Sequence, residues 1–311
     1  IQAAVTIVTA GLAVELFGFN NNIAIMASII LILCIIILTV GKYKLLDNFI
    51  KIVILILALS TLFAVGYATN NDMVELNVNQ IFPDEVSGII FLAAFMGWMP
   101  APLDVSIWQS IWTKEKLNLN NKIKYKSALF DFNVGYISTV FLGLCFVALG
   151  AFVMFGSGQT FSNNGSEFAN QLIKLYTANL GENVKIFISV AAFTTMLSTT
   201  ITCLDASPRA MSQTLKLLNH KKISGYNTWI LIISIVTMII FVFFESEMGT
   251  LIKIATILTF ITAPIYAIMN YSLVNSAYMP KKFKLSKSMK FYSISGIIFL
   301  TIFSIWYITL I

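Results

Sequence analysis

The chain has 311 residues, of which 58% are hydrophobic and 11% are charged, and its mean hydropathy is +0.85. Soluble globular domains have about 25% charged residues, so this composition excludes a soluble domain and indicates a membrane protein. The formal net charge of +6 follows from lysines in the loops between apolar segments, and it requires no nucleic-acid partner.

Nine apolar segments are long enough to cross a bilayer as helices. A hydrocarbon core of about 30 Å needs about 20 residues of α-helix at about 1.5 Å per residue. Segments such as 23–40 are continuously apolar, unlike the alternating strands of a β-barrel, so we predict an all-α polytopic membrane protein. The predicted spans are 1–17, 22–40, 49–68, 87–113, 128–156, 184–205, 225–244, 250–273 and 290–311.

Positive residues lie mainly in the loops after the second, fourth, sixth and eighth spans. Lys44, Lys122 and Lys282 are examples, whereas the intervening loops are poor in lysine and carry acids such as Glu245. Because positive loops are retained on the cytoplasmic side, the lysine-rich loops are predicted to be cytoplasmic. The span 1–17 is then predicted to enter the membrane from the cytoplasm.

The fourth span contains the stretch FMGWMPAPLDVSIWQS. Pro100 and Pro102 lack a backbone donor and disfavour helix at the residue before each, so we predict a broken helix at 98–103. A break at membrane depth leaves backbone groups without partners, which is tolerated where they face protein, water or a ligand. Many secondary transporters build their binding sites at such breaks.

Residues around this break are candidate metal ligands. The outer half-helix ends at Met96 and Gly97, whose carbonyl oxygens would present partial negative charge to a cation. Met99 lies in the break, where its thioether would suit a softer transition metal better than magnesium or calcium. Asp104 begins the inner half-helix, where it either caps that helix or lines an ion or proton path.

Two further acids have competing interpretations. Asp205 shares a helical face with Ser198 and Thr202, so it either lines a cytoplasmic vestibule and an ion path or pairs with Arg209 four residues later. Asp131 lies near the inner end of the fifth span. There, capping or solvation at the interface competes with a role in a proton path.

The remaining reactive residues do not form a recognisable catalytic site. Cys34, Cys145 and Cys203 all fall inside predicted spans, which argues against a disulfide framework or a metal cluster. His220, the single histidine, lies in a lysine-rich loop. No catalytic motif occurs in a supporting context, so we predict no enzymatic activity and no cofactor.

The string GWMPAPLDVSIWQS is similar to the sixth helix of the natural resistance-associated macrophage protein (Nramp) metal-ion transporters, whose unwound centre has a Met-Pro-His core. Met99 and Pro100 match this core, and Ala101 stands where the histidine would be. The segments 191–215 and 252–274 resemble the eighth and tenth helices of a divergent bacterial branch, with Thr256 near the place of a tenth-helix glutamine. The resemblance implies a divalent metal ion as substrate, with Thr256 near it.

The same resemblance implies two inverted repeats of five helices, followed by extra helices. Residues 1–311 would form a single transmembrane domain: 1–68 the remainder of the first repeat, 87–273 the second repeat, and 290–311 an extra C-terminal helix. The family's first two helices, the first of which carries an Asp-Pro-Gly-Asn metal-binding segment, would then precede Ile1. A chain that begins with Ile inside an apolar run fits this expectation.

We therefore expect a secondary active transporter of the bacterial inner membrane that imports manganese- or iron-class cations by alternating access. Protons are a candidate coupling ion, and we expect a monomer in the lipid bilayer. Two alternatives stay open: an amino-acid or other small organic solute symporter of the same fold, and a nontransporting membrane scaffold or sensor.

Overall fold

A computed structural model describes residues 1–18, 23–40, 42–69, 103–119, 125–153, 165–181, 185–220, 223–244 and 248–309, with short pieces at 88–89, 91–92, 95–96, 162 and 183. The chain divides into two compact units. Unit 1 comprises Ile1–Val78 and Trp108–Ile252, and unit 2 comprises Asn79–Ile107 and Lys253–Ile311.

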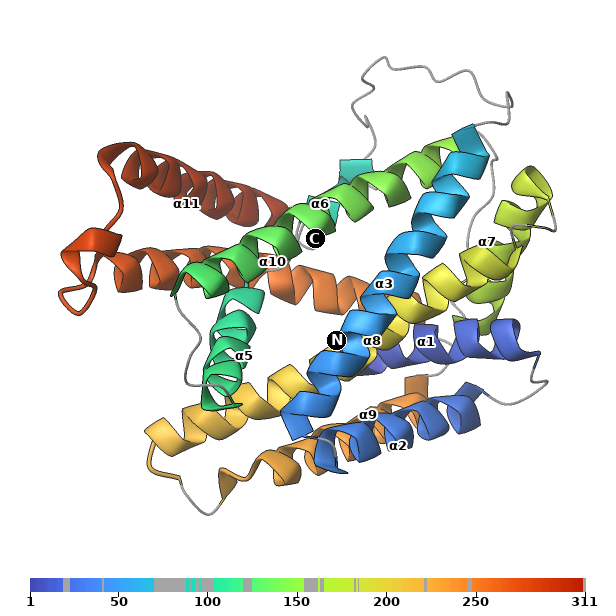
Figure 1. Cartoon of the computed structure of the whole chain (residues 1–311), viewed down its shortest axis with the longest axis horizontal. Helices are drawn as coiled ribbons and strands as arrows, with labels where there is room; N and C mark the ends of the chain where they lie inside the picture. Colours follow the sequence, from blue (N-terminus) through green and yellow to red (C-terminus); the bar gives the residue numbers. More distant parts are fainter. Residues whose placement is uncertain are drawn as a thin grey trace. The chain divides into compact units, whose positions relative to one another are not determined.

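Every regular element in the described ranges is helical (Figure 1), which confirms the all-α prediction. The elements are α1 (Gln2–Phe17), α2 (Ile23–Val40), α3 (Lys42–Thr69), α5 (Val105–Leu119), α6 (Tyr125–Val153), α7 (Gly165–Leu180), α8 (Lys185–Leu217), α9 (Tyr226–Phe244), α10 (Met248–Asn275), the 3-10 turn η3 (Lys281–Phe283) and α11 (Lys287–Ile308).

Most of the predicted spans coincide with these helices. Within the described residues, α2, α3, α6, α8, α10 and α11 are long and apolar enough to cross a membrane, and α1 and α9 are shorter apolar helices. The helix α8 continues beyond the predicted end at 205 to Leu217, with Pro208 inside it. Hydropathy marks where a segment leaves the bilayer, whereas the helix ends only where its backbone hydrogen bonds end.

Unit 1 is built around α1. Its residues from Ala3 to Ala13 are all buried, and the helix packs against α2, α7 and α8. Seven of the eleven residues in this buried stretch are alanine, glycine or threonine, and small residues let helix backbones approach closely in membranes. The hydroxyl groups of Thr9 and Thr200 are 2.7 Å apart across the interface between α1 and α8. Packing of small residues with a polar contact therefore holds α1 against α8.

The other helices of unit 1 complete this core and expose apolar faces. The helices α2 and α9 lie side by side (Figure 1), and α3 packs against both α8 and α6. Outward-facing side chains of α2, α3 and α6 include Leu33, Leu55 and Ile137, which are 54%, 59% and 67% exposed. Apolar surface on this scale suits contact with lipid tails rather than water. The chain is a multi-pass membrane protein.

Unit 2 contains a contact between α10 and α11 that compensates for a proline. Pro264 lies inside α10 and has no N–H, so the carbonyl group four residues earlier, on Phe260, lacks its helical donor. The Ser304 hydroxyl of α11 donates to this Phe260 carbonyl oxygen at 3.3 Å. The Phe260 ring also packs against Phe303 and Tyr307, with centroid separations of 5.4 and 5.5 Å. This contact fixes α11 to α10 at the proline.

Candidate functional site

The predicted break in the fourth span falls largely outside the described residues. Gly97, Met99, Pro100 and Pro102 lie there, and their assigned roles remain predictions. Met96 is helical and half-buried on the outer side of the break. On the inner side, residues 103–104 form a turn and α5 then begins, so the predicted inner half-helix is present.

Asp104 lies in the turn that leads into α5. Its backbone carbonyl oxygen accepts from the Ile107 N–H at 2.9 Å. Its Oδ1 atom is buried and has no hydrogen-bond partner among the residues that the structure describes. A buried carboxylate oxygen without a donor is costly, which is compatible with an ion or proton path but leaves the capping interpretation open.

The start of α5 also contacts α10 within unit 2. The Ser106 hydroxyl donates to the Leu103 carbonyl oxygen at 2.7 Å and accepts from the Asn270 side-chain amide at 2.9 Å. Thr256, the other predicted site residue on α10, is only 5% exposed. Unit 2 thus holds Asp104 and Thr256, together with a polar contact that positions the first turn of α5.

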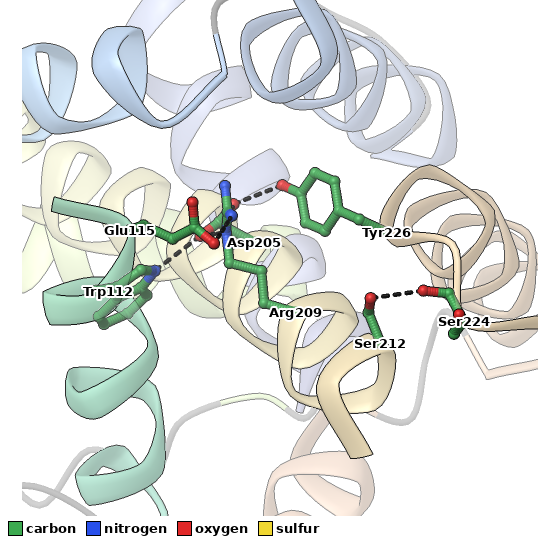
Figure 2. A network of polar contacts seen from close by, with 7 residues as sticks. All are labelled: Trp112, Glu115, Asp205, Arg209, Ser212, Ser224 and Tyr226. Atoms are coloured by element: carbon green, nitrogen blue, oxygen red, sulfur yellow. Dashed lines mark hydrogen bonds and ion pairs between the residues drawn. The ribbon is translucent and has the colours of Figure 1, made fainter. Parts of the chain in front are cut away.

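Asp205 on α8 is the most completely paired acid of the predicted set. Its exposed fraction is 0%, and its carboxylate accepts hydrogen bonds from three side chains (Figure 2). Arg209 donates from Nε to both oxygens, with nitrogen–oxygen distances of 2.8 Å. Trp112 donates from Nε1 to Oδ2 at 2.7 Å. The Tyr226 hydroxyl donates to Oδ1. The pairing with Arg209, one of the two interpretations of the sequence, is therefore present.

Arg209 links this carboxylate to a second acid. Its Nη1 atom is 3.4 Å from Glu115 Oε1, and its guanidinium carbon lies 4.5 Å from the centroid of the Tyr226 ring. We call these five residues, Trp112, Glu115, Asp205, Arg209 and Tyr226, the Asp205 cluster. A charge buried away from water is tolerated when it is paired and hydrogen-bonded, and the cluster meets both conditions while joining α5, α8 and α9.

Asp131 lies in a more exposed environment. Its side chain is 57% exposed, and Lys116 of α5 approaches it with Nζ to Oδ2 at 3.1 Å. The same Lys116 lies 4.0 Å from Asp47 of α3, which also pairs with Lys51. These ion pairs join α3, α5 and α6 at a solvent-accessible surface, where screening keeps each contribution small.

The family model described as "Nramp: Natural resistance-associated macrophage protein-like" matches residues 2–310. The chain belongs to the Nramp family. Uncharacterized protein PM0681 of Pasteurella multocida (strain Pm70) is 33% identical over 279 residues, which cover 88% of this chain and 63% of that protein. The Nramp chain thus spans less than two thirds of the length of this bacterial relative.

Sequence reasoning missed three members of the Asp205 cluster in this Nramp chain. Trp112 and Glu115 lie on α5, and Trp112 precedes Asp205 by 93 residues. Tyr226 begins the next helix, α9, 21 residues after Asp205. No spacing within one helix therefore connects these residues to Asp205. The usable signal in the sequence was the position of Asp205 within a predicted apolar span, because a carboxylate buried there requires donors from neighbouring helices.

Other candidate ligands of the Nramp chain are dispersed. Within the described residues, no group of three or more His, Cys, Asp or Glu side chains could hold a metal ion. Cys34, Cys145 and Cys203 are each buried, and none of the three forms a disulfide bond. The predicted metal ligands are of another kind, a thioether and backbone carbonyl groups.

Proposed function

We propose that this chain belongs to a secondary active transporter that moves divalent transition-metal cations of the manganese and iron class across the bacterial inner membrane by alternating access. The observation that carries the proposal is the match of residues 2–310 to the Nramp family, whose members carry divalent metal cations as substrates. Helices with apolar, outward-facing side chains supply the membrane setting that such transport requires.

The proposed metal site is the broken fourth span. Met99 supplies a thioether that favours softer metals, and the carbonyl groups of Met96 and Gly97 supply oxygen ligands. Thr256 contributes from α10. The Asp104 carboxylate faces the ion or proton path, a role supported by its buried Oδ1 atom, which has no hydrogen-bond partner in the described part of the chain. The metal is the substrate here and not a resident cofactor.

The first test is manganese uptake by the full-length protein in proteoliposomes, with and without an imposed pH gradient. Saturable uptake that persists in excess magnesium and calcium is the expected result, since those cations prefer oxygen ligands. Dependence of the rate on the pH gradient would identify protons as the coupling ion. No uptake under any gradient by folded protein would overturn the proposal.

Met99→Ala tests the thioether separately. We expect this change to lower manganese uptake and to weaken its discrimination against magnesium and calcium. Met269→Ala is the matched control, because Met269 lies on α10 with 59% exposure, and we expect normal uptake from it. Unchanged uptake and selectivity in Met99→Ala would remove the thioether from the site. Competition by amino acids in place of metals would instead favour an organic solute symporter.

A further inference from the structure

The helix α5 contacts other helices of unit 1 through polar side chains. None of its 15 residues, all of which the structure describes, is buried, whereas α1 is buried along most of its length. Three side chains in its second half reach other helices of unit 1 through polar contacts: Trp112 to Asp205, Glu115 to Arg209, and Lys116 to Asp131. Such contacts depend on direction and distance, so they break over a small displacement that an apolar interface would tolerate.

The partner of α5 in the cluster, α8, is firmly held. It packs against α1, α3 and α9, and its buried residues Ile201 and Leu204 belong to the main apolar core of unit 1. Asp205 follows them directly and is itself 0% exposed. The carboxylate is therefore a fixed acceptor, and the indole group of Trp112 is the donor that comes from the exposed helix.

Separation of α5 from α8 would leave no isolated charge in the interior. Without Trp112, the Asp205 carboxylate retains Arg209 and Tyr226 as donors, as Figure 2 shows. Arg209 likewise retains Asp205 when Glu115 departs. If a buried charge had only one partner, loss of that partner would leave it uncompensated, and the helices would resist separation strongly. In this arrangement the charge pair stays on α8 with Tyr226, and only the contacts to α5 are exchanged for other partners.

We propose that the Trp112–Asp205 hydrogen bond and the Glu115–Arg209 ion pair form a latch, which holds the inner half-helix α5 against α8 in one state of the transport cycle and releases it in the other. This inference rests on the proposed transport function. The helix α5 is continuous from Val105. Trp112 lies seven residues further along it, which is about 10 Å along the helix axis at about 1.5 Å per residue. Movement of α5 at the latch therefore displaces the chain next to Asp104. In this proposal Trp112 and Glu115 act as positioning residues, through Asp205 and Arg209.

The decisive variant is Trp112→Phe, which keeps an aromatic ring and removes the indole donor. Trp108→Phe is the matched control, since Trp108 lies one turn earlier on α5 and its ring contacts Trp112 at a centroid separation of 6.2 Å. Spin labels at Leu119→Cys on α5 and Leu217→Cys on α8, both exposed, report the separation of the two helices in the full-length protein. Both positions lie in unit 1.

We expect electron–electron distance measurements on Trp112→Phe to show a longer α5–α8 separation gaining population by roughly tenfold, the effect of losing one charge-assisted hydrogen bond. Glu115→Gln should shift the same population in the same direction, and Trp108→Phe should match the parent protein. Glu115 is 27% exposed in its side chain, so this variant keeps the test available if Trp112→Phe fails to fold.

The outcomes separate the latch from the transport proposal. If manganese uptake is present but Trp112→Phe and Glu115→Gln both give the parent distance distribution, the latch is refuted and the transport function stands. If the distances shift as expected but neither the parent protein nor any variant takes up manganese, α5 moves as inferred and the proposal that the protein transports manganese is wrong.

Discussion

Substitution of Ser304 by alanine should destabilise the contact between α10 and α11, because the Ser304 hydroxyl replaces a backbone donor that Pro264 of α10 lacks. Pro264 removes the backbone donor that Phe260 would otherwise use, and the Ser304 hydroxyl supplies the replacement at 3.3 Å. Ser304 and Phe260 are 5% and 2% exposed, so water cannot readily take over. Ser304→Ala would leave a carbonyl oxygen without a donor in an apolar setting.

The expected loss is about 1 kcal/mol in the free energy of unfolding. A buried polar group left without its partner costs roughly 1–3 kcal/mol, but hydrogen bonds between membrane helices average about 0.6 kcal/mol with a maximum near 1.7. The 3.3 Å separation is longer than a typical O–H···O bond, which favours the lower part of these ranges. A loss of 1 kcal/mol changes the folding equilibrium about fivefold.

A double-mutant cycle in mixed micelles, followed by titration with a denaturing detergent, tests this reasoning. Pro264→Ala restores an N–H to α10, so Ser304→Ala should cost much less in that background than in the parent protein. Thr301→Ala is the matched control, because the Thr301 hydroxyl donates within its own helix to Ile297 at 2.8 Å. An equal cost of Ser304→Ala with and without Pro264 would refute the compensation, even if the variant were destabilised.

Three further predictions concern the rest of the chain. Thr200→Val should lower the free energy of unfolding by about 0.6 kcal/mol, and by no more than about 1.7, through loss of its contact with Thr9 across α1 and α8, measured by the same titration. Asp131→Asn should change stability by less than about 1 kcal/mol because its ion pair is solvent-exposed; a loss of uptake without a loss of stability would instead support its predicted place in a proton path. Single cysteines at the exposed positions Lys174 and Lys282 should react with an impermeant maleimide from the outside and the cytoplasmic side respectively, and the reverse pattern would overturn the predicted topology.

The helical fold could be predicted from the sequence because the bilayer imposes a strong local constraint. A continuously apolar segment must satisfy its own backbone, and only a helix does so within one segment. This argument predicted the segments that became α2 and α10 without knowledge of their neighbours. It did not predict that α8 reaches Leu217, because the last part of that helix is polar and carries no hydropathy signal.

The candidate site was only partly predictable, because sequence patterns report contacts within one helix and not contacts between helices. The Asp205–Arg209 pair follows from a spacing of four residues on one helix. The bonds from Trp112 and Tyr226 depend on how α5 and α9 lie against α8, which helix periodicity cannot supply. Similarly, the donor from Ser304 to Phe260 could be anticipated as a need created by Pro264, but the residue that meets the need is set by tertiary packing.

The two acids Asp104 and Asp205 show why residue type alone does not assign a role in a membrane protein. Asp205 accepts bonds from three side chains and has a guanidinium group against both oxygens, so a cation approaching it would have to compete with Arg209. Asp104 has a buried oxygen without a hydrogen-bond partner among the described residues, and a cation or a proton would relieve that cost. The same side chain thus holds helices together at Asp205, whereas at Asp104 it keeps one buried oxygen without a hydrogen-bond partner among the described residues. The surrounding donors, and not the carboxylates themselves, make this difference.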